Sequence, residues 1–199
     1  MQQFVETIKI EDGKALNLNF HQARMERTMR HFFAHTPVPM LSGVLSPTPD
    51  MHFYKARVVY GGQGVEDVQY ASYKMREIRS LKLVEDNEID YSFKSTDRAC
   101  LNRLTAQKGD CDEVLIVKNG LLTDTSFTNI AVFDGERWLT PKHPLLLGTK
   151  RASLLERQVI READISVETL MKAQKVSLIN AMIDLGEIEI TTQMVNRGL

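Results

Sequence analysis

The sequence predicts a mixed α+β fold in which helices and β-hairpins follow one another without a regular repeat. Short segments of alternating polar and apolar residues, typical of strands, occur along most of the chain. Several of them are joined by two-residue turns, which indicates antiparallel hairpins. The order of elements is not the strict strand–helix alternation of a doubly wound parallel sheet. The 199 residues allow one large domain or two small ones.

The first predicted elements are a hairpin and a helix. Residues 5–10 alternate as a strand, Asp12-Gly13 follows as a turn, and residues 16–18 are a short return strand. Residues 20–33 have the apolar spacing of a helix, with Asn19 as the predicted N-cap. Two prolines that follow predict its end.

The middle of the chain predicts a second hairpin and a connection. Residues 53–60 and 65–76 are expected to pair across a glycine-rich turn. Residues 82–91 contain an acidic segment, which we interpret as the connection between two halves of the chain.

The second half is expected to be richer in strands. Its predicted helices are 97–107, a helix that Gly148 opens and that runs to about residue 163, and 167–173. Its predicted strands are 113–118, which ends at an Asn119-Gly120 turn, then 130–133, 137–140, 176–182 and 188–190.

Charge and cysteine content narrow the possible functions. The net charge of −1 supplies no overall field to hold nucleic acid or an anionic membrane. The two cysteines, Cys100 and Cys111, match neither a disulfide framework nor a zinc site and suit a reducing cytoplasm. We find no signal peptide and no apolar run near the ~18 residues that a membrane span needs. The sequence therefore predicts a cytoplasmic protein.

Two polar segments are candidate sites, each with a purely structural alternative. Residues 121–130 place Asp124, four hydroxyls and Asn129 between apolar strands, although such side chains also satisfy local backbone groups. The sequence Gly148-Thr149-Lys150-Arg151 precedes a helix, where free N–H groups, a hydroxyl and two cations suit a phosphate. Simple capping by Thr149 would explain the same residues.

A lysine and a group of histidines are the remaining candidates. Lys94 lies between aromatic residues and a predicted helix start; most lysines are solvated surface charges, but a desolvated one can form a Schiff base. His21 and His31 lie on the predicted helix 20–33 and His35 follows closely, yet no nearby carboxylate or cysteine completes a ligand set, and we expect no metal. Dinucleotide, P-loop and nucleophile-elbow motifs do not occur.

Taken in order, these segments resemble the class IV aminotransferases, the pyridoxal-phosphate enzymes of fold type IV. The resemblance spans nearly the whole chain, and each motif is weak alone while the series is specific. The matching elements are Val5-Glu6-Thr7-Ile8-Lys9, His21-x-x-Arg24, Lys94, Leu101-Asn102-Arg103-Leu104, residues 112–116, Gly120-x-x-x-Asp124-x-x-x-x-Asn129-Ile130, Thr140-Pro141, Gly148-Thr149-Lys150-Arg151 and Ile179-Asn180-Ala181-Met182.

The resemblance implies a pyridoxal 5′-phosphate site and a role for each matching residue. Lys94 would bind the cofactor covalently and move protons at the substrate. Asp124 would face the pyridine nitrogen and keep it protonated. Arg24, Gly148, Thr149 and Lys150 would surround the phosphate, Asn129 would shape the loop around the ring, and Asn180 would lie where the last cofactor strand passes the phosphate.

Three departures from the family pattern are visible. Asp124 stands where the family usually has glutamate, and Thr149-Lys150 stands where it often has Ile-Thr. The chain also begins at the family's first strand, so we expect an N-terminally shortened member. The implied domains are a small one at 1–85, a connection at 86–93 and a larger cofactor-binding one at 94–199.

The function implied by the resemblance is that of a pyridoxal-phosphate-dependent enzyme on a small amino substrate. The Leu-Asn-Arg-Leu and Asn-Ala-Met segments favour aminodeoxychorismate lyase, which yields 4-aminobenzoate and pyruvate. An aminotransferase of the branched-chain or D-amino-acid type is the alternative, and a non-catalytic cofactor-binding homologue is a further one. Family members are typically homodimers, so a homodimer is expected.

Overall fold

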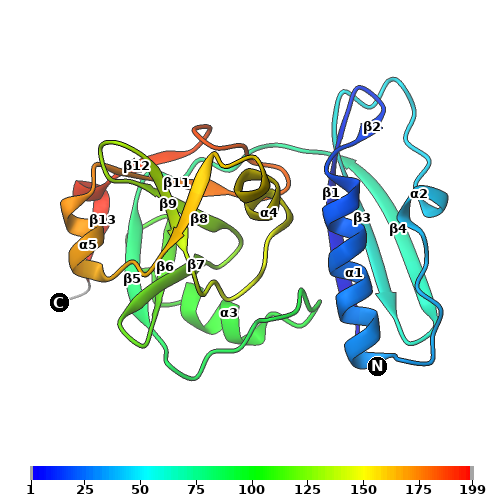
Figure 1. Cartoon of the computed structure of the whole chain (residues 1–199), viewed down its shortest axis with the longest axis horizontal. Coiled ribbons are helices and arrows are strands. Elements are labelled where there is room, and N and C mark those ends of the chain that lie inside the picture. Colours follow the sequence, from blue (N-terminus) through cyan, green and yellow to red (C-terminus); the bar gives the residue numbers. More distant parts are fainter. Residues whose placement is uncertain (1, 198–199) are drawn as a thin grey trace. The chain divides into compact units, whose positions relative to one another are not determined.

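The computed structural model describes residues 2–197 and divides the chain into two compact units. The first contains Met1–Met75 and Phe93–Asp97, and the second contains Arg76–Ser92 and Arg98–Leu199. Both units mix helices with sheets, which confirms the predicted α+β class (Figure 1).

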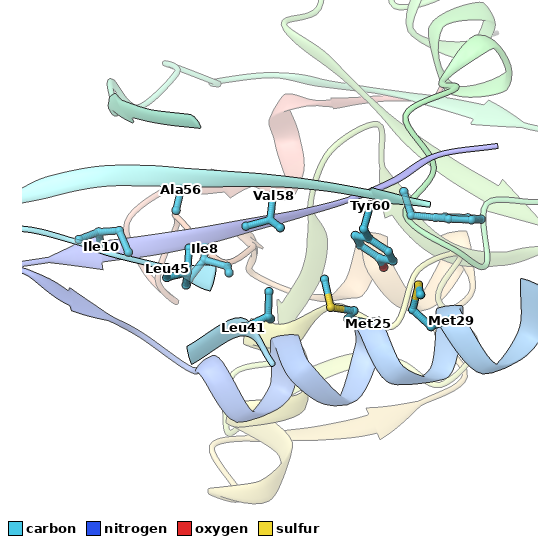
Figure 2. Close-up of a cluster of buried hydrophobic side chains, with 10 residues drawn as sticks. Ile8, Ile10, Met25, Met29, Leu41, Leu45, Ala56, Val58 and Tyr60 are labelled. Carbon is cyan, nitrogen blue, oxygen red and sulfur yellow. The ribbon is translucent and has the colours of Figure 1, made fainter. Parts of the chain in front are cut away.

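The first unit is a four-stranded antiparallel sheet with a helix against it. Its sheet order is β2-β1-β3-β4. Its elements are β1 Phe4–Glu11, β2 Lys14–Ala15, α1 Leu18–Phe32, α2 Leu41–Val44, β3 Phe53–Gly61 and β4 Gly64–Ser72. Met25 and Met29 of α1 face Ile8 of β1 and Tyr60 of β3 in a buried apolar core (Figure 2).

The start of α1 differs from its sequence prediction. The helix begins at Leu18 and its N-cap is Asn17, in the left-handed conformation with φ 53°, rather than Asn19. Asparagine tolerates this conformation better than most residues. The return strand is correspondingly earlier, at Lys14–Ala15 instead of residues 16–18, so the chain turns into the helix sooner than its apolar pattern predicts.

The second unit contains two mixed sheets. One has the strand order β13-β5-β6-β7 and the other β10-β9-β8-β11-β12. Its elements are β5 Leu81–Glu85, α3 Ala99–Thr105, β6 Glu113–Lys118, β7 Leu121–Thr125, β8 Asn129–Phe133, β9 Trp138–Pro141, α4 Thr149–Glu156, β10 Ile160–Ala163, α5 Val167–Lys172, β11 Lys175–Ile179, β12 Glu189–Thr191, the 3-10 helix η1 Thr192–Met194 and β13 Val195–Asn196.

Two segments of the second unit were predicted differently. Residues 82–91 do not form only a connection, because β5 pairs in parallel with β6 over five residues, Leu81 to Glu85. The unit boundaries accordingly differ from the predicted 1–85, 86–93 and 94–199. The helix opened by Gly148 ends at Glu156, not near residue 163; Gln158 then takes a left-handed φ of 58°, and β10 pairs in parallel with β9.

The predicted hairpins are confirmed where the turn chemistry is strong. Asn119 and Gly120 both have positive φ, 52° and 75°, as a two-residue turn between β6 and β7 requires. Between residues 2 and 197, no helix combines the length and the apolar character needed to cross a membrane.

Candidate active site

Asp124 lies near the end of β7, with its side chain only 4% exposed. Its Oδ1 accepts a hydrogen bond of 2.8 Å from Asn129 Nδ2, and its Oδ2 accepts one of 2.9 Å from the Leu146 backbone N–H. Burial raises the pKa of this carboxyl to about 6, and the two hydrogen bonds oppose that rise. The protein therefore holds a desolvated carboxyl in a fixed orientation.

Asn129 connects Asp124 to the loop that leads into α4. The same Nδ2 that donates to Asp124 also donates to the Leu146 carbonyl at 2.8 Å. Gly148 lies against this amide, since a Cβ on Gly148 would be 1.8 Å from Asn129 Oδ1. Only glycine permits so close an approach. The segment that contains Asp124 and Asn129 and the separate segment that begins at Gly148 thus form one group.

Helix α4 begins directly after Gly148, whose backbone is extended. The first N–H groups of a helix have no partner within the helix and carry the positive end of its dipole. The first turn of α4 contains no acidic residue. Thr149 and Lys150 are buried here, so an anion at this end would meet backbone N–H groups and a hydroxyl.

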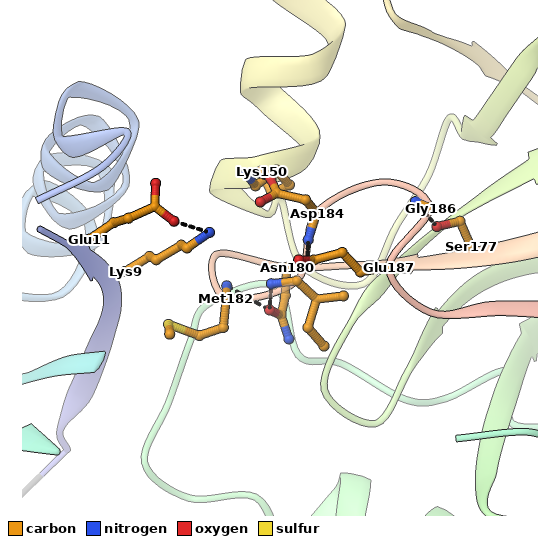
Figure 3. A network of polar contacts seen from close by, with 10 residues as sticks. Lys9, Glu11, Lys150, Ser177, Asn180, Met182, Asp184, Gly186 and Glu187 are labelled. Atoms are coloured by element: carbon orange, nitrogen blue, oxygen red, sulfur yellow. Dashed lines mark hydrogen bonds and ion pairs between the residues drawn. The ribbon is translucent and has the colours of Figure 1, made fainter. Parts of the chain in front are cut away.

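The two cations of this turn contact carboxylates of the protein itself. Lys150 Nζ forms an ion pair with Asp184 (Figure 3). Arg151 donates to Glu162 at 2.6 Å and to the Pro141 carbonyl at 2.8 Å. Both side chains therefore stabilise the surroundings of α4, and the phosphate role predicted for Lys150 remains a prediction.

Asn180 follows β11 and organises the loop after it. Its Oδ1 accepts hydrogen bonds from the backbone N–H groups of Met182, at 2.8 Å, and Ile183, at 3.0 Å (Figure 3). Its Nδ2 donates to the Phe127 carbonyl at 3.3 Å, in the turn between Asp124 and Asn129. Asn180 therefore connects this loop to the segment that carries Asp124.

Lys94 belongs to the first unit and is half-buried. Its carbonyl accepts a 3.0 Å hydrogen bond from the Val5 N–H, and its neighbour Ser95 forms an antiparallel bridge with Phe4. The ring of Phe93 stacks on His31 of α1, with ring centroids 4.8 Å apart. The backbone on both sides of Lys94 is thus held by β1 and α1.

Arg24 lies on α1 in the same unit, within a buried polar group that sequence reasoning missed. Its guanidinium contacts the carboxylate of Glu6 on β1, and His21 contacts the same carboxylate. The signal for Glu6 was present in the sequence, because it falls in phase with the apolar residues Phe4 and Ile8 on the core side of the strand. Within residues 2–197, no three metal-ligating side chains form a group that could hold an ion.

The comparisons with known proteins concern the family and the fold of the chain. The family model described as amino-transferase class IV matches residues 65–189. The chain is 38% identical over 186 residues to an uncharacterized protein of Haemophilus influenzae, covering 92% of this chain and 98% of that protein.

Two solved structures extend the comparison. A protein of Haemophilus somnus described as "a putative 4-amino-4-deoxychorismate lyase" superimposes with a TM-score of 0.86 at 34% identity, covering 93% of this chain and 98% of that one. A hypothetical aminotransferase from Mycobacterium tuberculosis in its PLP-bound form gives a TM-score of 0.74 at 18% identity, covering 97% of this chain and 81% of that one. That second likeness concerns the fold alone.

The architecture is that of the fold type IV enzymes. The chain belongs to the class IV aminotransferase family.

Proposed function

We propose that this protein is a pyridoxal-phosphate-dependent enzyme acting on an amino-acid-like substrate, with aminodeoxychorismate lyase activity as its reaction. The observation that carries the proposal is the buried Asp124 carboxylate, oriented by Asn129 and the Leu146 N–H next to Gly148 and α4. Support for the lyase comes from the Haemophilus somnus structure, which is 34% identical and is described as "a putative 4-amino-4-deoxychorismate lyase".

The chemical groups of these residues fit those of pyridoxal phosphate. A buried carboxylate suits the protonated ring nitrogen, and a helix that starts at a glycine against Asn129 suits a phosphate dianion. The half-buried Lys94 would supply an amine, and the buried Arg24 would supply a second phosphate contact. Pyridoxal phosphate, when bound, supplies an electron sink for the carbon that bears the substrate's amino group.

Each residue of the chain has a definite task in this proposal. Lys94 would hold the cofactor through Nζ, take the proton from the carbon bearing the amino group and return a proton to the departing pyruvate. Asp124 would keep the ring nitrogen protonated through its negative charge. Arg24, Thr149 and the first N–H groups of α4 would bind the phosphate, and Lys150 would place α4 through its ion pair with Asp184.

Aminotransfer is the second candidate, because the family model that matches residues 65–189 is named for it. Both reactions would begin with the same proton removal by Lys94. They would differ in what Lys94 does next: in the lyase it would protonate the departing pyruvate group, whereas in the aminotransferase it would return the proton on the cofactor side, and the amino group would pass to a 2-oxo acid.

Product analysis distinguishes the two candidates. The purified protein, loaded with pyridoxal phosphate, is incubated with aminodeoxychorismate and separately with amino acids plus a 2-oxo acid. A lyase releases 4-aminobenzoate and pyruvate in equal amounts even when no 2-oxo acid is added. An aminotransferase forms a new amino acid only when the oxo acid is present, and the absence of both products would overturn the proposal.

The assembly proposed for the enzyme is a homodimer, as the family resemblance implies. Light scattering on the eluting peak of a sizing column measures the mass directly. A mass near 45 kDa, twice the chain mass of 22.7 kDa, is expected for the dimer.

A further inference from the structure

Glu6 is a carboxylate placed inside the apolar core of the first unit. It lies on β1 between Phe4 and Ile8, which are buried on the same face, and its own side chain is 0% exposed. Removing a carboxylate from water is strongly unfavourable unless charged and hydrogen-bonded partners compensate. Partners of Glu6 must therefore be part of the fold.

The compensating partners are two residues one turn apart on α1. Arg24 donates through Nε to Oε1 at 2.9 Å and through Nη2 to Oε2 at 2.5 Å, the bidentate geometry of a strong arginine–carboxylate pair. His21 Nδ1 lies 2.6 Å from Oε2. Because a carboxylate only accepts hydrogen bonds, the His21 proton in this contact must be on Nδ1.

The charges in this group are consistent with the geometry. Burial by itself would raise the pKa of Glu6, but the Arg24 guanidinium and the His21 hydrogen bond lower it to about 2. Burial lowers the pKa of His21, and the positive charges of Arg24 and Lys94 act in the same direction, against the opposing effect of Glu6. At neutral pH the group is an ionised Glu6–Arg24 pair with a neutral histidine.

This arrangement fixes the direction of a side chain that is otherwise flexible. An arginine that is free in solution loses rotamer entropy when it binds a ligand, and an arginine already held in place loses less. Glu6 holds the edge of the guanidinium that contains Nε, so the plane of the group is set by β1 before any ligand arrives.

We propose that Glu6 is a positioning residue that holds the Arg24 guanidinium in the orientation needed to bind the phosphate of the cofactor. The inference rests on the proposed function, since it takes Arg24 as a phosphate ligand. His21 supports the same arrangement by occupying the second lone pair of Oε2.

Charge and orientation predict opposite effects of removing Glu6 on phosphate binding, and this makes the inference testable. A phosphate dianion near Arg24 is repelled by the Glu6 charge, so Glu6→Gln should tighten binding if charge alone mattered. If orientation dominates, Glu6→Gln should weaken binding about two- to tenfold, the range expected when one long side chain must be ordered on binding.

The experiment compares two probes on apo protein, pyridoxal phosphate and pyridoxal, which lacks the phosphate. Dissociation constants are measured for the wild type, Glu6→Gln and the control Glu26→Gln, whose carboxylate pairs with Arg30 at the surface of the same helix as Arg24. Glu6→Gln should weaken pyridoxal phosphate binding and leave pyridoxal binding unchanged. Glu26→Gln should change neither constant.

A double-mutant cycle shows whether Glu6 acts through Arg24. In an Arg24→Lys background, which cannot make the bidentate contact, Glu6→Gln should cost much less affinity than in the wild type. If circular dichroism shows that Glu6→Gln does not fold, Glu6→Asp tests the same point. Aspartate keeps the charge but is one methylene too short to hold both Nε and Nη2 of Arg24.

Three results would overturn the inference. Unchanged or tighter pyridoxal phosphate binding by a folded Glu6 variant shows that orientation by Glu6 is unimportant. An equal loss for both probes shows a general structural effect. If the wild type binds both probes equally, there is no phosphate site, and the failure then lies in the proposed function.

Discussion

The side-chain amide of Asn129 bridges the Asp124 carboxylate and the Leu146 carbonyl with two hydrogen bonds of 2.8 Å from one nitrogen. Since Leu146 also donates its N–H to Asp124, the three groups form a closed ring of contacts. The orientation of Asp124 is therefore coupled to the loop that starts α4. Substitutions in this ring should affect both places together.

Replacing Gly148 tests the contact between the loop and Asn129. Gly148→Ala would place a Cβ 1.8 Å from Asn129 Oδ1 and force the amide away from Asp124. We expect a loss of about 1–3 kcal/mol in the free energy of unfolding, as for overpacking in general. Urea unfolding measures it, with Gly43→Ala as the control, because nothing lies within 4 Å of a Cβ on Gly43. Equal stability of the two variants would contradict the contact.

The raised pKa of Asp124 predicts how the stability of the apo protein depends on pH. Its folded pKa of about 6 lies above the ordinary 3.8, so the folded state binds a proton more tightly than the unfolded state. Protonated Asp124 thus contributes stability fully below about pH 4, and this contribution is lost as the pH rises through 6. The full change is on the order of 3 kcal/mol, from about two pKa units.

Asp124→Asn removes this titration and serves as the reference. Unfolding free energies of the wild type and the variant, measured in urea from pH 4 to pH 8, should diverge with the wild type losing stability as the pH rises. A constant difference between the two proteins across this range would show that Asp124 is not desolvated in the folded state.

The length of the acidic side chain at position 124 should matter in the folded protein. The family usually has glutamate there, which by itself suggests that Asp124→Glu is mild. In the structure, however, the Asp124 carboxylate fits between Asn129 and Leu146 at its present length. An added methylene should therefore lower the free energy of unfolding by about 1–3 kcal/mol.

Asp124→Ala should raise the activation barrier on a confirmed substrate by about 4 kcal/mol, which lowers the rate by about three powers of ten.

Lys94 should be the residue that holds the cofactor. Borohydride reduction of the loaded protein followed by peptide mapping should place the label on Lys94, and Lys94→Ala should remove it. The fold should survive, because the contacts that hold this segment are made by the Lys94 backbone and by Phe93. Lys14→Ala, at an exposed position, is the control that should keep the label. A label on a different lysine would refute the assignment.

Arg24→Lys should weaken pyridoxal phosphate binding by about tenfold or more while leaving the turnover of saturated enzyme nearly unchanged. A charge-assisted hydrogen bond contributes about 1.5–3 kcal/mol. A lysine ammonium lacks the planar fork by which the Arg24 guanidinium holds Glu6 with two nitrogens, so it would also be oriented less well toward a phosphate. A contact between Arg24 and the phosphate would be the same in ground and transition states, so its loss should affect affinity rather than rate. Titration of the apo protein measures the dissociation constant, and an unchanged value would leave α4 as the phosphate site.

Local sequence signals were enough to predict the hairpins and the helices that begin near Leu18 and Val167. They were also enough to single out the residues of the candidate site. Turn chemistry such as Asn119-Gly120 acts over a few residues, so it can be read without the rest of the chain. The order of weak motifs likewise indicated the family, because it depends only on spacing along the chain.

Tertiary structure alone decided the parallel pairings and the partners of the charges. Nothing in residues 81–85 shows that they pair with 113–117, since a strand's neighbours are set by packing over long distances in sequence. Glu6 and Arg24 are 18 residues apart, and Lys150 and Asp184 are 34 apart. A charge in a sequence reveals its type, but burial and the position of its partner exist only in the folded chain, and these decide whether it binds a ligand or another side chain.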